Sequence, residues 1–239
     1  MTKDEGKVKT EISGKEVKTR KREKYKTGKG RRMKYITGYL WNRGSDSVLL
    51  QQVKAGQARI AFGWITDRGE TGAMLTGQVK AWFEEDGIQL CKKGREESLT
   101  ESLHRQLQNA RASKAAYAGI ILQGEMLWMF QKGGMKLWTL NSRFQKSYMR
   151  EMTERIREEG EKGILTGRIQ KGVGILLETG SLCEILHKEE IKECLAASDI
   201  RADDQLKRRL KELDRLAIER RKEAGQEERG SSAIYIKTV

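Results

Sequence analysis

A short turn in the second half of the sequence has the residue types of a functional site. Residues 175–177 (Ile-Leu-Leu) form an apolar run, and residues 178–181 (Glu-Thr-Gly-Ser) follow it. The leucines and isoleucines of residues 182–191 then recur at helical spacing, which predicts a helix. A turn between a strand and a helix holds its side chains on a rigid support, so functional groups are often found there. This turn offers a glycine and two hydroxyl groups.

Other kinds of catalytic site are not indicated by the sequence. The phosphate-binding pattern GxxxxGK[ST] does not occur. A serine hydrolase needs a histidine base near its nucleophile. His104 falls beside Leu103 on a predicted helix, and His187 falls in a helix rich in Lys and Glu, so both are expected at or near the surface. The carboxylates of residues 158–163 and 187–193 are mixed with lysines, which is typical of solvated helix faces.

The cysteines predict neither a disulfide framework nor a zinc site. Cys91, Cys183 and Cys194 are odd in number, and no pair has C-x-x-C spacing. We interpret them as core thiols in a reducing compartment. No apolar run approaches the roughly 18–20 residues of a membrane span, and the first residues lack the apolar segment of a secretory signal. We therefore expect a soluble, cytoplasmic protein.

Basic residues are concentrated at the start of the chain. The net charge is +14, and residues 1–34 contribute +9 of it, with 14 Lys and Arg against 5 Asp and Glu. Their apolar content is too low to offset the entropy cost of ordering. We predict a flexible basic tail over residues 1–34 and one folded domain over residues 35–239. Weak binding of nucleic acid or another anionic surface is predicted for seven residues of this tail: Lys18, Arg20, Lys21, Arg22, Lys24, Arg31 and Arg32.

The remaining sequence alternates groups of predicted strands with groups of predicted helices. Strands are predicted at residues 33–41, 47–53, 58–65, 115–124, 125–133, 135–141, 164–169, 175–177 and 231–239. Helices are predicted at residues 71–85, 144–160, 182–191 and 203–224. A further helix is predicted to begin at a capping box formed by Ser98 and Glu101. This order predicts an α+β fold with mainly antiparallel sheets.

Several segments resemble, in order, the motifs of the metal-dependent protein serine/threonine phosphatases of the 2C (PPM) type. That family begins with a Gly, an Arg and Asn-Glu-Asp before a strand, and residues 38–47 here read GYLWNRGSDS. A family strand that ends in Asp-Gly-Met-Gly-Gly before a helix is similar to residues 58–75. The family's Gly-Asp-Ser-Arg strand is similar to residues 133–138 (GGMKLW).

Three later segments complete the resemblance, which covers about residues 35–239. Residues 165–168 (LTGR) resemble the family's Leu-Thr-Arg, and residues 176–182 (LLETGSL) resemble Leu-Leu-x-Ser-Asp-Gly-Leu. Residues 229–236 (RGSSAIYI) resemble the final Arg-Gly-Ser-x-Asp-Asn-Ile-Thr-Val. The resemblance implies a four-layer α-β-β-α sandwich with two mainly antiparallel sheets flanked by helices. It also implies two Mn or Mg ions, held by acids, whose bridging water attacks a phosphoserine or phosphothreonine.

Most of the family's acidic positions carry other residues in this chain. By this alignment, the replaced acids are at Ser45, Phe62, Gly180 and Ala233. Asp46 is the only retained acid, and Trp41 replaces the phosphate-binding Arg, with Arg43 nearby. We expect Asp67, five residues beyond Phe62, to lie away from the strand end. Two divalent ions roughly 3.5–4 Å apart repel each other and need several anionic oxygens. We therefore expect no bound cofactor, no intact metal site and no catalytic residue.

Three hypotheses of function remain open from the sequence. The first is a catalytically silent phosphatase-like domain that acts as a regulatory or protein-binding module. The second is binding of nucleic acid or an acidic surface through the basic tail. The third is a residual metal-dependent serine/threonine phosphatase in which Asp67, Glu70 or another acid has become a ligand.

The tail hypothesis predicts that residues 1–30 are dispensable for folding. Deleting them is expected to leave the thermal midpoint almost unchanged, because they contribute little apolar area to a core. A fall of more than roughly 5 °C in calorimetry, on the order of 1–2 kcal/mol for a domain of this size, would show that they pack against the domain. Any binding of nucleic acid by the full chain is expected to weaken steeply as salt is added.

Overall fold

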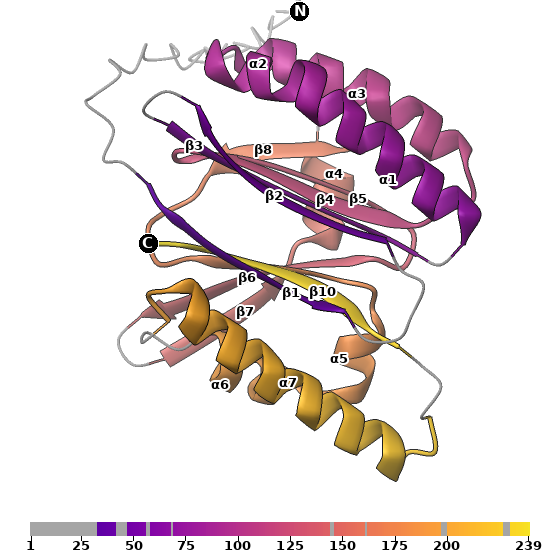
Figure 1. Ribbon diagram of the computed structural model, residues 1–239, viewed down its shortest axis with the longest axis vertical. Coiled ribbons are helices and arrows are strands. Elements are labelled where there is room, and N and C mark those ends of the chain that lie inside the picture. The colour runs from indigo at the N-terminus through magenta and orange to yellow at the C-terminus, as the bar shows by residue number, and fades with distance from the viewer. Residues whose placement is uncertain are drawn as a thin grey trace, which may run out of the picture. The chain divides into compact units, whose positions relative to one another are not determined.

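Two antiparallel sheets of five strands each are stacked face to face in the computed structural model, with helices on both outer faces (Figure 1). The structure describes residues 33–41, 47–55, 58–67, 69–143, 146–160, 162–196, 200–226 and 230–239, which belong to a single unit. The layer order confirms the predicted α+β fold, a four-layer α-β-β-α sandwich with two mainly antiparallel sheets.

Each sheet combines strands from distant parts of the sequence. The first sheet has the order β1 (Tyr35–Trp41), β10 (Ser232–Thr238), β9 (Gly174–Glu178), β6 (Lys136–Arg143) and β7 (Lys146–Glu151). The second sheet has the order β2 (Ser47–Ala55), β3 (Ala58–Thr66), β4 (Tyr117–Gln123), β5 (Met126–Lys132) and β8 (Ile164–Arg168). Strands β1 and β2 are therefore edge strands on one side of the sandwich, and β7 and β8 are edge strands on the other.

The helices form two outer layers. The second sheet is covered by α1 (Glu70–Trp82), the π-helical turn η1 (Phe83–Gly87), α2 (Ile88–Lys92) and α3 (Glu96–Ala112). The first sheet is covered by α5 (Ser181–Ile185), α6 (Lys188–Leu195) and α7 (Asp203–Glu223). The short helix α4 (Thr153–Glu159) contacts β5, β6 and β8.

The strands at the centre of each sheet bury both of their faces, because one face meets the other sheet and the opposite face meets helices. In β10, Ile234 and Ile236 belong to the core between the sheets, whereas Ala233 and Tyr235 belong to the core beneath α5, α6 and α7. Successive side chains of a strand point to opposite faces. The position of a residue along its strand therefore decides which of the two cores it enters.

Three local predictions differ from the structure. Residues 144–160, predicted as one helix, contain the edge strand β7 and the short helix α4, because residues 146–151 pair with β6. The predicted helix over residues 182–191 is interrupted at Leu186 and His187, where α5 ends and α6 begins. Helix α3 begins at Glu96, so Ser98 and Glu101 lie inside it and do not form the predicted capping box.

The described chain begins with two residues that contact the domain. Met33 is buried, and Lys34 exchanges two backbone hydrogen bonds with Val239, at 3.2 and 2.9 Å. These contacts extend the folded region two residues before the predicted boundary at residue 35. The seven basic residues proposed to bind anions lie outside the described residues.

The cysteines and helices bear on two further expectations. Cys91, Cys183 and Cys194 all have free thiols, and Cys91 and Cys194 are buried, as expected of core thiols. None of the described helices is both long enough and apolar enough to cross a membrane.

Close packing at one glycine gives a test of the second sheet. Gly119 in β4 pairs directly with Phe130 in β5, and a Cβ atom at Gly119 would lie 2.2 Å from the buried Phe130 ring. We expect Gly119→Ala to destabilise the protein by about 1–3 kcal/mol, because the ring must move within a filled core. Urea unfolding measures this change. Gly167→Ala in β8 is the control, since a Cβ there meets no atom within 4 Å. Equal stability of the two variants would contradict the packing described.

Candidate functional site

The turn predicted from the sequence lies where several strand ends of both sheets meet. Ser232 at the start of β10 pairs with Trp41 at the end of β1, and Thr66 at the end of β3 pairs with Ser47 at the start of β2. Strands β3 and β10 also contact each other across the sandwich. We call this region the site end, defined by Thr66, Asp67, Gly134, the turn at residues 179–181 and Ser232. The connection at residues 42–46, which joins β1 to β2 there, lies outside the described residues.

Asp67 is the residue that directly follows β3, so the prediction that it lies away from the strand end is wrong. Its backbone N–H donates to the carbonyl of Ala116 (3.1 Å), and its Oδ2 accepts from the N–H of Ala116 (3.0 Å). Ala61 and Ile65, at alternate positions before it, belong to the core between the sheets. Strand alternation therefore directs Asp67 towards the same inter-sheet side. Its Oδ1 is buried and has no hydrogen-bond partner among the described residues.

Three hydroxyl groups stand opposite in the first sheet. The hydroxyl of Ser181 donates to the carbonyl of Gly230 (3.1 Å), so the contact between the hydroxyls of Thr179 and Ser181 (3.1 Å) has Thr179 as donor. The Thr179 hydroxyl also accepts from the backbone N–H of Ser232 (3.4 Å). The Ser232 hydroxyl is buried without a partner in the described structure. These groups are neutral, and two of the three are engaged in holding the turn.

Gly180 occupies a backbone conformation that suits glycine. Its φ is +87°, and a Cβ atom there would lie 2.9 Å from the carbonyl oxygen of Gly134 in the β5–β6 turn. Both the positive φ and this contact oppose any larger residue. The turn therefore carries no side chain at the position where the resemblance implies an aspartate, and it closes against the neighbouring turn.

Glu178 precedes this turn but faces the helices. Its carboxylate accepts hydrogen bonds from Trp138 Nε1 (2.8 Å) and from the backbone N–H of Cys183 in the first turn of α5 (3.0 Å). The side chain is fully buried, and burial raises the pKa of the Glu178 carboxyl, because a charge is poorly solvated there; the hydrogen bonds and the charge of Lys136 act in the opposite direction. Glu178 thus anchors α5 to the sheet and does not face the inter-sheet side.

Two residues aligned with the family's acids lie elsewhere in the fold. Phe62 is in the middle of β3, buried against the helices and stacked on Phe83 with ring centroids 4.3 Å apart. Ala233 faces α5, α6 and α7. The residues that stand at these strand ends on the inter-sheet side are Asp67 and Ser232. Ser45 and Asp46 lie outside the described residues, as does the side chain of Trp41.

The donor set at the site end does not fit two divalent ions. Asp67 supplies one carboxylate, and one of its oxygens already accepts a backbone N–H. Gly180 supplies no side chain, and Glu178 is directed to the helices. Within the described ranges, no group of three or more His, Cys, Asp or Glu side chains could hold a metal ion. Neutral hydroxyls cannot offset the repulsion between two divalent cations.

Sequence reasoning misplaced Asp67 and missed the roles of Ser232 and Glu178. Asp67 had a usable signal, because Asp67 and Gly69 come directly before a helical pattern and mark a turn. Ser232 differs from the aligned Ala233 by one residue, and only the pairing of β10 decides which of them faces the other sheet. Glu178 had no signal, because its partners Trp138 and Cys183 are fixed by tertiary structure.

The same fold occurs in solved phosphatase structures. PppA, described as a key regulatory component of T6SS in Pseudomonas aeruginosa, matches with a TM-score of 0.55 and 13% identity over 86% of this chain and 98% of that one. A structure of SpoIIE from Bacillus subtilis that contains its PP2C phosphatase domain and a fragment of its regulatory domain matches with a TM-score of 0.56 and 12% identity. The match covers 85% of this chain and 63% of that one. The catalytic domain of the phosphatase PstP, in complex with two manganese ions, matches with a TM-score of 0.50 and 14% identity. The match covers 87% of this chain and 98% of that one.

These likenesses show that the chain has the fold of the 2C-type serine/threonine phosphatases. The identities are too low to show more than the fold. No protein-family model and no curated protein sequence matches this chain.

The buried carboxyl of Glu178 predicts a pH dependence of stability. Its pKa in the folded state is raised above the ordinary value of 4.5, so its contribution is fully present below about pH 4.5 and is lost as the pH rises through the folded-state pKa. Glu178→Gln stays neutral, so its unfolding free energy should decline less between pH 4.5 and 8. Urea unfolding across this range measures the difference. Glu158→Gln, at an exposed position on α4, should keep the wild-type slope. Parallel curves for all three proteins would refute the assignment.

Proposed function

We propose that this protein is a catalytically silent domain with the phosphatase fold, which acts as a regulatory, protein-binding module. The observation that carries the proposal is the chemistry of the site end. Gly180 stands where the resemblance implies an aspartate, and Ser232 lies next to the aligned Ala233 on the inter-sheet side. The turn at residues 179–181 is held by its own hydroxyls. A shaped surface is kept, while the anionic oxygens that would hold two metal ions are not.

Electrostatics supports the absence of phosphatase chemistry. Counting Asp46 from the sequence and Asp67 from the structure, two acids remain, and the other positions are Ser45, Gly180 and Ser232. An ion that is short of anionic ligands keeps its water shell and stays in solution. Without the ions there is no group to lower the pKa of an attacking water at neutral pH.

A phosphatase with relocated ligands requires further acids near Asp67. Glu70 is the nearest acid in the sequence, and it is exposed at the start of α1. Asp67 and Glu70 together supply two carboxylates, and one oxygen of Asp67 already accepts a backbone N–H. This donor set would hold two ions only weakly. This hypothesis is therefore less favoured than a silent domain, and the metal titration below decides between them.

Protein binding is the function that the retained fold supports best. Gly133 and Gly134 are exposed at the site end, and Lys136 and Lys188 flank the Trp138 ring, with Nζ atoms 5.9 and 4.8 Å from its centroid. A neutral, hydroxyl-lined turn beside lysines suits a polypeptide partner with hydrogen-bonding and acidic groups. The similarity to PppA, itself described as a regulatory component, is compatible with this role. Nucleic-acid binding by the basic tail stays a prediction from the sequence.

Metal binding and turnover give the direct test of the silent site. We expect the full chain to bind no pair of Mn²⁺ ions at millimolar concentration in calorimetry, and to release no phosphate from phosphoserine peptides, phosphothreonine peptides or aryl phosphates. Manganese-dependent turnover that is removed by a chelator and by Asp67→Asn would overturn the proposal and favour relocated ligands.

The binding role is tested with two matched arginine variants. A Cβ at Gly134 and a Cβ at Gly77 each meet no atom within 4 Å, so Gly134→Arg and Gly77→Arg should both fold. Gly134→Arg places a large cation at the site end, whereas Gly77→Arg places one on the exposed side of α1. Proteins that are captured from cell extract by the wild type should be lost with Gly134→Arg and kept with Gly77→Arg. Equal capture by both variants would show that the site end is not the binding surface.

A further inference from the structure

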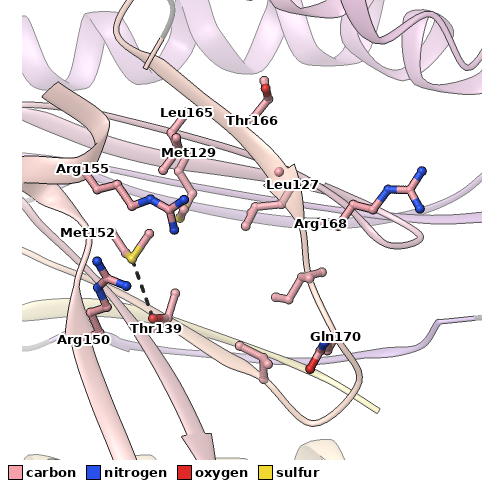
Figure 2. Close-up of a pocket in the computed structure, with 13 residues that line it drawn as sticks. Leu127, Met129, Thr139, Arg150, Met152, Arg155, Leu165, Thr166, Arg168 and Gln170 are labelled. Carbon is pink, nitrogen blue, oxygen red and sulfur yellow. Dashed lines mark hydrogen bonds between the residues drawn. The ribbon is translucent and has the colours of Figure 1, made fainter. Parts of the chain in front are cut away.

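A second feature of the molecule is a cavity on the side of the sandwich where β7 and β8 are the edge strands. Its volume is about 340 Å³, and it is lined by residues of β5, β6, β7, β8 and α4 and by residues 169–173 (Figure 2). It lies away from the site end. Its β5 residues are Leu127 and Met129, near the start of that strand, whereas the site end adjoins the other end of β5 at Lys132.

One inward-facing position that lines the cavity lacks a side chain. Leu165 in β8 and Ile169, which directly follows β8, belong to the core between the sheets, and Gly167 lies between them on the same face. A Cβ atom at Gly167 would meet no heavy atom within 4 Å. Besides Gly167, six polar residues and six apolar residues line the cavity, and the apolar ones are Leu127, Met129, Met152, Leu165, Ile169 and Val173. The pocket can therefore take a hydrocarbon group of modest size.

Two arginines stand at one side of this apolar space. Arg150 projects from the edge strand β7, where it pairs with Thr139, and Arg155 projects from α4. Figure 2 shows both guanidinium groups directed towards Met152, whereas Arg168 points away from them. Arg150 forms no side-chain hydrogen bond or ion pair with any other described residue. Arg155 uses Nε to contact Glu159 (2.6 Å), so its two Nη groups are not used in that ion pair.

The charged residues that line the cavity are all arginines, and Glu159, which pairs with Arg155, lies outside the lining. None of the described residues that line it is acidic. Two guanidinium groups directed to one place favour an anion between them, and their planar forks match the oxygens of a carboxylate or a phosphate. A volume of about 340 Å³ is within the usual range for small-molecule pockets, which begins near 300 Å³.

We propose that this cavity binds a small organic anion, whose carboxylate or phosphate head is held by Arg150 and Arg155 and whose short apolar tail fills the space beside Gly167. Each part of the site recognises a different part of the ligand. The arginines select a negative head, and the glycine leaves room for a tail that inorganic phosphate does not have. The inference is independent of the function proposed for the site end.

The test is calorimetric titration of the full chain with four probes: hexanoate, hexyl phosphate, hexanol and inorganic phosphate. We expect saturable binding of at least one of the two amphiphilic anions, and at least tenfold weaker binding of hexanol and of inorganic phosphate. The tighter of hexanoate and hexyl phosphate identifies the head group. Failure of both anions to bind at millimolar concentration would overturn the proposal.

Substitutions distinguish binding in this cavity from non-specific attraction of an anion to a basic protein. Arg150→Gln and Arg155→Gln should each weaken binding about tenfold, the loss of roughly one charge-assisted contact. Arg157→Gln, at an exposed position on α4 outside the cavity, is the control and should bind as the wild type does. Gly167→Leu should abolish binding of the tail, and Gly167→Ala should reduce it less. Anion binding that is unchanged in the Arg150, Arg155 and Gly167 variants would place the ligand elsewhere and refute the assignment.

Discussion

The requirement that the central strands bury both faces governs most of this structure. Strands β3 and β10 have no solvent-facing side, so alternate residues along each strand must pack into two different cores. A slip of one residue would exchange the two sets, which makes the register strongly specified. The same requirement limits where polar groups can stand. They are found at strand ends, where the two cores stop, and at the edge strands, where one side is open.

This constraint explains which parts of the fold could be read from the sequence. The leucine stripe of α7 and the apolar run of β10 are unambiguous, because only one period fits each of them. Residues 144–160 are misleading, because Tyr148, Met152 and Ile156 satisfy helical spacing, whereas residues 146–151 form a mostly exposed edge strand with no clear alternation. Pairing with β6 decides the outcome, and pairing is not visible in a single sequence.

The candidate site was harder to predict than the fold, because a site depends on single positions. The turn at residues 179–181 could be predicted because an apolar run precedes it and a helical pattern follows it. The structure confirms that it connects a strand to a helix. At β3 and β10 the sequence alignment places the family's acids at Phe62 and Ala233. Phe62 and Ala233 match the motifs by order along the chain, but their side chains enter the cores under the helices. Asp67 and Ser232 occupy the strand ends on the inter-sheet side. The order of segments along the chain locates a motif. The register of the strand decides which residue of that motif faces the other sheet.

The local stability of the turn rests on Glu178. This acid is buried on the helix-facing side, where Trp138 and the first turn of α5 hold it. The hydroxyls of Thr179 and Ser181 then fix the turn to β10 and to Gly230. One acid and several hydroxyl groups thus surround the turn, yet they act within the fold. Their number says little about chemistry until the direction of each side chain is known.

The contact between Gly180 and Gly134 also bears on how this chain can evolve. An acid introduced at Gly180 meets a positive φ and the Gly134 carbonyl in the same step, so the β5–β6 turn must move before the new side chain can serve as a ligand. A single substitution therefore yields a strained protein. Introducing a metal ligand at this turn would therefore have to pass through less stable intermediates, so the contact makes this part of the site end resistant to gradual change.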